Sequence, residues 1–346
     1  MAVLLLLRGS QVHHNTILTK LIRRDGRAMS EREDSEQPLV SVVIPTYDRP
    51  TFLREALESV ATQSYRPIEV IVVDDASPES VTSVVQETLP SAVEWQCIRH
   101  ETNRGANAAR NTGIDASSGD VVAFLDDDDR WEPNKLRVQT NALLTPEREH
   151  GVCLVGQRFV DETGRTTFIK RPRLSGSATR DLLTGAIAGP FSTIAVRRSV
   201  LEAAGYPDES LPSLQDRDWL LRLSEHTSFI SVATPLIRRR SGAYGQIGDQ
   251  YANKRDQTYP HFLTHYRLTA QTYGVESQFV AWLNASVAGS ALRAGAYREC
   301  VQFSLRSLHS YPAHREAWSY LLASIGGDVT YRPAQAIKRR VSGGLR

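Results

Sequence analysis

Between residues 39 and 125, short apolar runs alternate with amphipathic segments, and this order of elements restricts the possible folds more than any other feature of the chain. The runs LVSVVIP (39–45) and IEVIVVD (68–74) are rich in β-branched residues, which is typical of buried parallel strands. The stretch between them repeats apolar residues at helical spacing, at Phe52, Leu53, Ala56, Leu57 and Val60. Further helices are predicted within 78–89 and 106–116, and further strands at 94–99 and 120–125. The pattern therefore predicts an α/β fold with an open, mostly parallel sheet flanked by helices.

Acidic residues directly follow two of the predicted strands. Asp74 and Asp75 end one strand, and four aspartates, Asp126–Asp129, follow another. Because the carboxyl ends of parallel strands meet at one edge of a sheet, these carboxylates would repel each other unless a cation lies between them. A hard divalent ion, Mg²⁺ or Mn²⁺, takes such oxygens together with phosphates, and Asp126 and Asp128 can face one ion because alternate residues point the same way. A solvated acidic turn explains the four aspartates about as well.

Composition and missing motifs exclude several classes of protein. The chain carries 41 Lys and Arg against 39 Asp and Glu, a balance that argues against a non-specific nucleic-acid binder. Three widely spaced cysteines, Cys97, Cys153 and Cys300, predict neither a disulfide framework nor a zinc site and suit a reducing cytoplasm. The sequence has no G-x-x-x-x-G-K-[ST] motif, no calcium-loop spacing and no apolar run long enough to span a membrane.

The pattern changes after residue 150. The segments 153–160 and 194–198 are typical of strands and 218–226 of a helix, whereas the chain beyond Tyr251 is predicted to be helical. We expect an extension over 1–38, an α/β domain over 39–248, a helical accessory domain over 249–335 and a basic flexible tail over 336–346. Met29 opens a charged lead-in to the first strand, so it is expected to be the biological start or to follow a disordered extension.

Three segments together resemble the family 2 glycosyltransferases of the GT-A fold. They are SVVIPTYDRPTFLREALESVATQSYRPIEVIVVDDAS, NRGANAARNTGIDASSGDVVAFLDDDDRWEPNKL and LPSLQDRDWLLRL, in the order and at the spacing of that family. The resemblance runs from about residue 39 to about residue 240 and leaves out the helical C-terminal region. It implies an inverting transfer of a sugar from a nucleotide-diphosphate donor to a hydroxyl of a glycan or a lipid-linked acceptor.

The resemblance also implies roles for individual residues. Those expected to bind the nucleotide are Pro45, Thr46, Tyr47, Asp75, Arg104, Gly105, Arg110, Asp126 and Asp127, with Asn103 and Asn111 beside them. Asp126 and Asp128 match the Asp-x-Asp motif that holds the divalent metal on the diphosphate. Considered without the resemblance, Tyr47 is an aromatic at the edge of the core, and Arg104 and Arg110 are surface charges at a helix end.

Asp216 matches the catalytic base of the family. An acceptor hydroxyl that attacks the anomeric carbon must lose its proton to a carboxylate, and the metal-binding carboxylates cannot do both jobs. Asp218 competes for this role, because both residues precede the apolar run WLLRL and either could cap a helix. Gln215 stands where the family usually has Glu, which removes one negative charge beside the base.

The segment Arg238–Gln250 matches a loop that closes over the diphosphate in the family. Arg238, Arg239 and Arg240 could contact phosphates, and the glycines at 242, 245 and 248 would let the loop move. A solvated strand end is the alternative for these arginines. Relatives often carry a histidine in this loop and this chain has none, so any third protein ligand of the metal stays open.

Acceptor and sugar contacts are expected from Trp131, Phe191, Gln215 and Arg240, with Gly189, Pro190 and the stretch 206–213 nearby. The helical region would bind the acceptor or support a homo-oligomer. The basic tail, with Lys338, Arg339, Arg340 and Arg346, could place the protein at the inner face of a membrane, although such a tail is usually only solvated.

Two other functions fit parts of the pattern. A nucleotidyltransferase that makes activated sugars would also bind a metal at the edge of such a sheet. It should have a glycine-rich loop after the first strand, and the segment PTYDRPTF at that position contains no glycine. A non-catalytic nucleotide-sugar-binding or scaffold protein on the same fold would use the helical region as its working surface. An intact Asp-x-Asp motif together with Asp216 argues against the second function.

Overall fold

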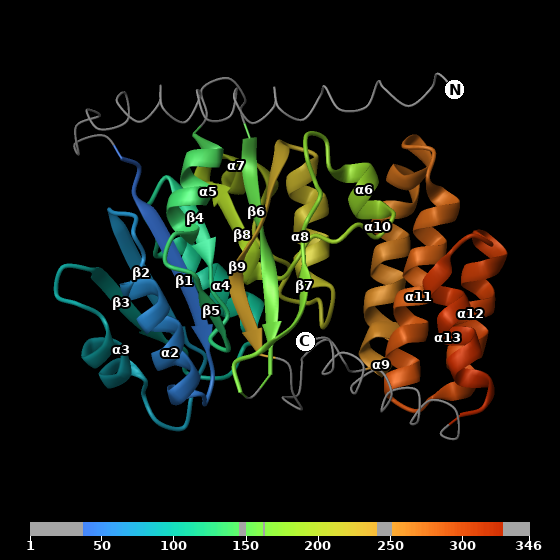
Figure 1. The fold of residues 1–346 in the computed structure, drawn as a ribbon, viewed down its shortest axis with the longest axis horizontal. Helices are drawn as coiled ribbons and strands as arrows, with labels where there is room; N and C mark the ends of the chain where they lie inside the picture. The colour runs from blue at the N-terminus through green and yellow to red at the C-terminus, as the bar shows by residue number, and fades with distance from the viewer. Residues whose placement is uncertain (1–36, 145–149, 162, 241–250, 328–346) are drawn as a thin grey trace, which may run out of the picture. The chain divides into compact units, whose positions relative to one another are not determined.

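The four strands predicted between residues 39 and 125 are all present. The computed structural model describes residues 37–144, 150–161, 163–240 and 251–327. Strands β1 (Val40–Thr46), β2 (Ile68–Asp74), β3 (Glu94–Arg99) and β4 (Val121–Phe124) pair in parallel in the order β3-β2-β1-β4. Every residue of β1 and β4 is buried, which explains why these strands are mostly apolar and do not alternate between apolar and polar residues. Their carboxyl ends share one edge of the sheet (Figure 1).

The second half of the sheet is mixed. Strand β8 (Ile194–Arg197) runs antiparallel to β4 and to β6 (His150–Val160), and β6 runs parallel to β9 (Ser228–Arg240). The short β5 (Asp129–Trp131) runs antiparallel to the end of β9, and β7 (Thr166–Lys170) pairs with β6. The predicted mostly parallel sheet is confirmed, and its antiparallel pairs bring the far end of β9 next to the aspartates that follow β4.

Helices cover both faces of the sheet (Figure 1). The helices of the α/β region are α2 (Pro50–Ala61), α3 (Thr82–Thr88), α4 (Ala106–Asp115), α5 (Lys135–Leu143), α6 (Thr179–Leu183), α7 (Arg198–Ala204) and α8 (Gln215–Ser224). Those further along the chain are α9 (Tyr251–Asn253), a π-helical turn (Lys254–Thr258), α10 (Tyr259–Thr272), α11 (Glu276–Arg293), α12 (Tyr297–Ser310) and α13 (Arg315–Ile325). The predicted helical character beyond Tyr251 is confirmed for the described residues.

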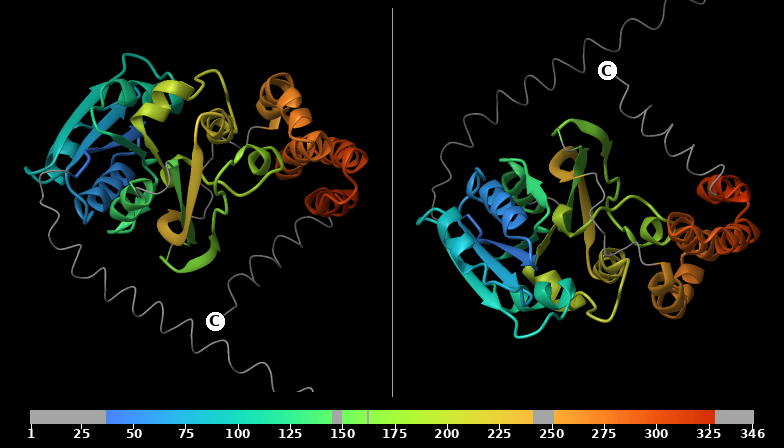
Figure 2. Two further views of the ribbon diagram at one scale, coloured as in Figure 1. Left: turned by 90° about the horizontal axis from the view of Figure 1, so that it is seen from above. Right: turned by 90° about the horizontal axis from the view of Figure 1, so that it is seen from below.

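Helices α10 and α11 share a hydrophobic core with the sheet. Phe262 and Tyr266 of α10 and Phe279 of α11 are buried in the same cluster as Phe124 of β4 and Trp219 of α8. Figure 2 shows, in both views, that the green segment around α6 adjoins the orange helices. The outer helices α12 and α13 pack on α11 around a second, smaller core. Among the described residues, none of the helices has the length and apolar character needed to cross a membrane.

Helix α4 lies close against β1 because residue 113 has no side chain. A Cβ atom on Gly113 would lie 2.4 Å from Cγ1 of Val43, which is fully buried in β1. We predict that Gly113→Ala lowers the free energy of unfolding by about 1–3 kcal/mol, measured by urea denaturation. Adding Val43→Ala removes the clashing methyl group, so the double variant should lose less than the sum of the two single losses. Additive losses would contradict the close approach.

Candidate active site

A cavity of about 460 Å³ opens at the carboxyl ends of β1, β2 and β4. Its wall includes the end of β1, the start of α4, the aspartates after β4 and the segment that leads into α8. The sequence-predicted residues among the lining ones are Pro45, Thr46, Tyr47, Asp75, Asn103, Gly105, Arg110, Asp126, Asp127, Asp128, Pro190, Phe191, Pro212, Ser213, Gln215, Asp216 and Arg239. The volume and the edge of the sheet are those expected for a small-ligand site in an α/β protein.

Asp75 holds the loop that precedes α4. Its Oδ1 accepts hydrogen bonds from Nδ1 of His100 at 2.7 Å and from the Arg104 amide at 2.8 Å, and its Oδ2 accepts one from the Gly105 amide at 2.7 Å. The other ring nitrogen of His100 contacts Thr112 at 2.9 Å. Gly105 has a φ of 92°, a conformation that favours glycine. Three protein donors therefore fix Asp75, and Asp75 in turn fixes the start of α4.

Asp127 is tied to the end of β1. Thr46 donates to its Oδ2 at 2.8 Å, and the Arg49 guanidinium lies 3.4 Å from its Oδ1. Burial raises the pKa of Asp127 to about 6, although Thr46 and Arg49 act in the opposite direction. The side chain of Tyr47, by contrast, is 47% exposed. Tyr47 is therefore free of the constraint that holds Asp127 and offers an open aromatic face to the cavity.

Arg110 supplies positive charge beside Asp126. Its guanidinium donates to Oδ1 of Asp126 at 2.6 Å and to Asn107 at 2.9 Å, and it lies 3.9 Å from the centre of the Phe191 ring. Arg110 is 5% exposed, and its Nε is buried with no hydrogen-bond partner among the described residues. A buried guanidinium with donors to spare, beside a cavity, is suited to an anionic ligand.

Arg239 is the matching cation on the other side of the acidic cluster. Its guanidinium lies 3.3 Å from Oδ1 of Asp129 and lines the cavity. Burial raises the pKa of Asp129 to about 7, with Arg239 acting in the opposite direction. Burial, and then the charge of Asp126, raises the pKa of Asp128. Asp126 and Asp128 therefore lie close enough to interact electrostatically within one cavity.

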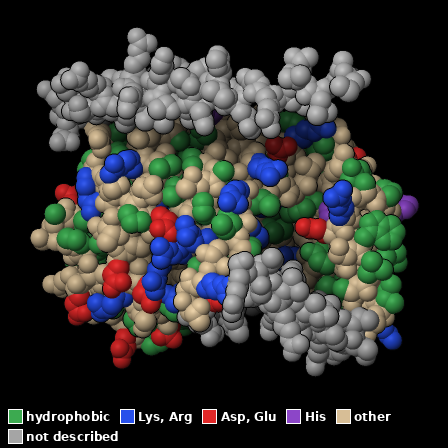
Figure 3. Space-filling view, in the orientation of Figure 1, with side chains coloured by type: hydrophobic (Ala, Val, Ile, Leu, Met, Phe, Trp, Pro, Cys, Tyr) green, Lys and Arg blue, Asp and Glu red, His purple; other side chains and the backbone are tan. Residues whose placement is uncertain are grey.

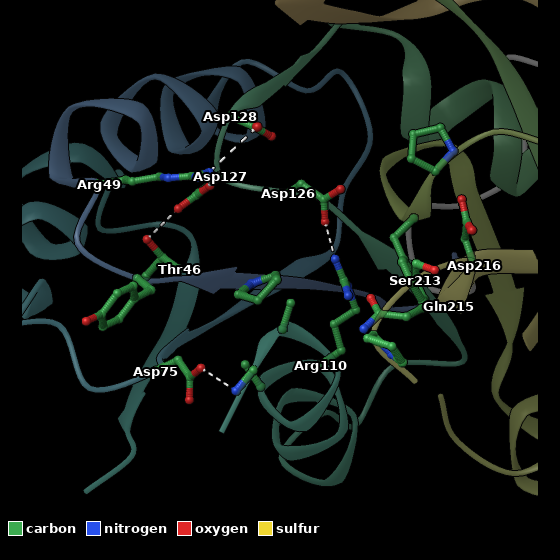
Figure 4. Close-up of a pocket in the computed structure, with 18 of the residues that line it drawn as sticks. Thr46, Arg49, Asp75, Arg110, Asp126, Asp127, Asp128, Ser213, Gln215 and Asp216 are labelled. Carbon is green, nitrogen blue, oxygen red and sulfur yellow. Dashed lines mark hydrogen bonds and ion pairs between the residues drawn. The ribbon is translucent and has the colours of Figure 1, made fainter. Parts of the chain in front are cut away.

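Asp216 and Asp218, which the sequence could not separate, lie in different surroundings. Asp216 lines the cavity near the start of α8, and burial raises its pKa against the opposing effects of Arg217, Arg110 and Arg239. Asp218 is 2% exposed and its carboxylate accepts from Tyr266 at 2.7 Å, His261 at 3.0 Å and Arg222 at 3.2 Å. Figure 4 shows Asp216 across the cavity from Asp126 and Asp128. Of these two aspartates, only Asp216 lines the cavity and can contact a ligand there.

Comparison with known proteins agrees with this geometry. The model of the family described as glycosyl transferase family 2 matches residues 41–205, the part of the chain that contributes most of the cavity wall. Residues 41–205 are a family 2 glycosyltransferase domain. The match ends before Asp216, so the segment 206–240 completes the sheet and the cavity of the glycosyltransferase domain from outside the matched range.

Alignments of this glycosyltransferase domain with its relatives cover part of the chain. An uncharacterized glycosyltransferase of Haemophilus influenzae is 33% identical over 199 residues, which cover 55% of this chain and 64% of the relative. Another, from Rickettsia bellii, is 32% identical over 212 residues, which cover 59% of this chain and 30% of the relative. The chain thus spans between about a third and two thirds of the length of these curated relatives.

Solved structures identify the fold as GT-A. The mannosyltransferase PcManGT from Pyrobaculum calidifontis, in complex with GDP-Man and Mn²⁺, aligns with a TM-score of 0.53 at 19% identity and covers 90% of this chain and 94% of that one. S. aureus TarS 1–349, in complex with UDP-GlcNAc, aligns with a TM-score of 0.51 at 20% identity and covers 85% and 92%. The prediction of a GT-A fold is confirmed.

Two predicted contacts of the glycosyltransferase domain with sugar or acceptor need correction. Trp131 is 3% exposed, its ring packs over Nζ of Lys135, and its indole donates to the Ser192 carbonyl, so it belongs to the core. Arg240 contacts Glu55 and lies over the Phe52 ring, pointing away from the cavity-lining Arg239. Strand β9 continues to Arg240, and alternate residues of a strand point to opposite faces.

The remaining predicted residues are placed as follows. Gln215 lines the cavity and its amide donates to the Leu211 carbonyl at 2.6 Å. The Arg104 side chain turns outward to Glu209 at 3.3 Å, so only its backbone amide takes part in the loop held by Asp75. Arg238 pairs with Glu132 at 2.7 Å. Figure 3 shows basic and acidic side chains side by side on one face of the molecule, which suits such pairing.

Several predictions lie outside the described residues. They concern residues 1–36 with Met29, the glycines at 242, 245 and 248, and the basic residues of the tail. Sequence reasoning also missed His100, which carries no motif and follows a strand that is only partly buried. Its position directly after β3, at the same edge as Asp75, was the available signal.

His100 is predicted to stabilise the loop before α4 by satisfying Asp75. We expect His100→Leu to lower the free energy of unfolding by about 1–3 kcal/mol, because it leaves a buried carboxylate without one of its donors. Chemical denaturation measures the change. His309→Leu is the matched control, because His309 is exposed on α12 and should tolerate the same substitution. Equal stability of His100→Leu and wild type would contradict the assigned role.

Proposed function

We propose that the glycosyltransferase domain transfers a sugar from a nucleotide-diphosphate donor to an acceptor hydroxyl, with inversion at the anomeric carbon. The observation that carries this proposal is that Asp216 faces Asp126 and Asp128 across one cavity whose wall also holds three buried or half-buried arginines. One side of the cavity can hold a diphosphate and the other can accept a proton. The acceptor, a glycan or a lipid-linked glycan, stays a prediction, as do self-association and contact with a membrane.

Donor binding is assigned to the first half of the sheet. Tyr47 offers an aromatic face to the nucleobase, and Asp75 with the loop 103–105 borders the same end of the cavity. Arg110 and Arg239 place positive charge where the diphosphate would lie, and both are held by carboxylates and therefore pre-organised. The structures of other proteins with UDP-GlcNAc and with GDP-Man support a sugar nucleotide as the donor.

Asp126 and Asp128 are the residues proposed to hold a divalent ion. Both line the cavity, and the side chain of Asp128 is 36% exposed, so its oxygens can reach a ligand. In the described part of the chain, no group of three or more His, Cys, Asp and Glu residues could hold a metal ion. The proposal is that the two aspartates share the ion with phosphates of the donor. When bound, the ion would stabilise negative charge on the departing diphosphate. PcManGT is shown with Mn²⁺.

Asp216 is proposed as the general base. It would take the proton of the acceptor hydroxyl as that oxygen attacks the anomeric carbon opposite the leaving diphosphate. Burial raises its pKa, which makes its carboxylate a stronger base than that of an exposed aspartate. Phe191 and Pro190 lie in the same wall and exclude water from part of the reaction space.

Asp216→Asn should strongly reduce turnover and keep donor binding. Without a known acceptor, turnover is measured as hydrolysis of a panel of sugar nucleotides with water as acceptor, and we expect kcat to fall by at least about 10²-fold with nucleotide Kd unchanged. In wild type, kcat should fall as the pH drops through the pKa of Asp216, because only the carboxylate accepts a proton. The raised pKa places this acid limb at a higher pH than that of an ordinary aspartate. Normal turnover of Asp216→Asn would move the base elsewhere.

Asp128→Asn should weaken metal-dependent nucleotide binding. The substitution keeps the size of the side chain and removes one anionic oxygen ligand, so calorimetry with Mn²⁺ present should show a loss of about 10-fold or more in nucleotide affinity. Asp161→Asn is the control, because Asp161 lies in the exposed turn between β6 and β7. Wild-type affinity in Asp128→Asn would remove this residue from the metal site.

A further inference from the structure

We propose that helices α10 and α11 position the base Asp216 by holding three of its neighbours in the chain, Ser213, Arg217 and Asp218. The helices are then part of the catalytic unit and not a separate accessory domain. This inference rests on the proposed role of Asp216. It assigns positioning residues to the C-terminal region, which lies outside the matched family range of 41–205.

The first contact fixes the chain before α8. The hydroxyl of Ser213 lies 2.8 Å from that of Thr258, the last residue of the π-helical turn that leads into α10. Ser213 is 4% exposed and Thr258 is fully buried. Ser213 also lines the cavity, so the contact connects the cavity wall directly to the C-terminal helices. Leu214, the next residue, has a φ of 57°, a left-handed conformation that needs such support.

The second contact fixes the first turn of α8. The Tyr266 hydroxyl donates to Oδ1 of Asp218 at 2.7 Å and lies 3.1 Å from the Asp218 carbonyl, and His261 lies 3.0 Å from the same Oδ1. Nε of Arg222 donates a hydrogen bond to the other oxygen of this carboxylate, Oδ2 of Asp218, at 3.2 Å. A buried carboxylate that loses a donor is costly, so these bonds strongly restrain α8 against α10. Asp218 is two residues from Asp216 on this turn.

The third contact comes from the other side of Asp216. The Arg217 guanidinium donates to the Leu182 carbonyl at 2.6 Å and to the Ala186 carbonyl at 2.7 Å, and it lies 4.7 Å from the ring centre of Trp282 in α11. Trp282 in turn fits against Gly185, where a Cβ atom would lie 2.2 Å from its Cδ1. Helix α11 therefore supports both Arg217 and the segment that Arg217 binds.

These contacts leave the Asp216 carboxylate itself facing the cavity. In the described structure its hydrogen-bonding neighbour is the Arg217 amide at 2.8 Å, while the residues on either side are held from the C-terminal helices. Figure 4 shows Ser213, Gln215 and Asp216 on the opposite side of the cavity from Asp75 and Asp126. Loosening α10 should therefore misplace the base and leave the nucleotide side unchanged.

Tyr266→Phe tests the inference, because it removes one hydroxyl and keeps the ring in the core. We expect kcat for sugar-nucleotide hydrolysis to fall by about 10–100-fold, with donor KM and nucleotide Kd unchanged, as for a base displaced by a fraction of an ångström. Tyr259→Phe is the matched control. Tyr259 lies on the same helix, and its hydroxyl bonds within the helical region, to Asn284 at 3.3 Å, so its kcat should stay at the wild-type value.

The effect must pass through Asp216. In an Asp216→Asn background, Tyr266→Phe should cause no further loss of kcat, whereas a general weakening of the fold would lower it again. Should Tyr266→Phe fail to fold, His261→Gln removes the other α10 donor to Asp218 and is expected to give the same split between kcat and KM. Wild-type kcat in these variants, or an equal loss in Tyr259→Phe, would overturn the inference. Undiminished turnover of Asp216→Asn would instead refute the proposed base.

Discussion

The crowding of four aspartates at the end of β4 is the constraint on which the site depends. Carboxylates this close repel each other, and burial of Asp127 and Asp129 adds a desolvation cost. The chain offsets this with three arginines from three different elements: Arg49 ahead of α2, Arg110 in α4 and Arg239 in β9. Each ion pair joins a distant part of the chain to the same strand end. The electrostatic requirement of the cluster thus fixes the walls of the cavity.

The same charges give the cavity its chemistry. Arg110 and Arg239 are held by carboxylates, so they are positioned before any ligand arrives. Under the proposed function, Asp126 and Asp128 would hold a divalent ion that supplies further neutralising charge, and Arg110 and Arg239 would have donors left for the diphosphate. Asp216 stands apart from this cluster, on a helix that the C-terminal region holds. In the proposed function, charge stabilisation is therefore assigned to the aspartates and arginines around β4, and proton transfer to Asp216 on α8, which the C-terminal helices support.

Sequence patterns predicted the first half of the fold well, because they report local physics. Apolar periodicity predicted strands β1 to β4 and the helices between them. The rule that ligands bind at the carboxyl ends of parallel strands predicted where the acidic residues would lie. The order of strands in the second half required long-range pairing that no local pattern specifies. Trp131 was predicted to contact the acceptor or the sugar, but β5 pairs with β9 and the Trp131 ring lies in the core.

The sequence predicted which residue types form the candidate site, but it did not predict which of their side chains point into the cavity. Asp216 and Asp218 share a helix start, and their surroundings distinguish them: Tyr266, His261 and Arg222 bind the Asp218 carboxylate, whereas Asp216 lines the cavity. The three arginines 238–240 are equivalent as a sequence, yet their alternation along β9 sends Arg239 to the cavity and its neighbours to Glu132 and Glu55. His100 was missed because its importance arises from one partner, Asp75, that lies 25 residues away.

The central claim is that the aspartates after β4 and the arginines around them form a site for a nucleoside diphosphate with a divalent ion. Titration calorimetry of wild-type protein with UDP, GDP, dTDP and CDP, each with and without Mn²⁺, tests it most directly. The account predicts that one nucleotide class binds, and binds more tightly when Mn²⁺ is present. Absence of binding by all four nucleotides under both conditions would contradict the claim.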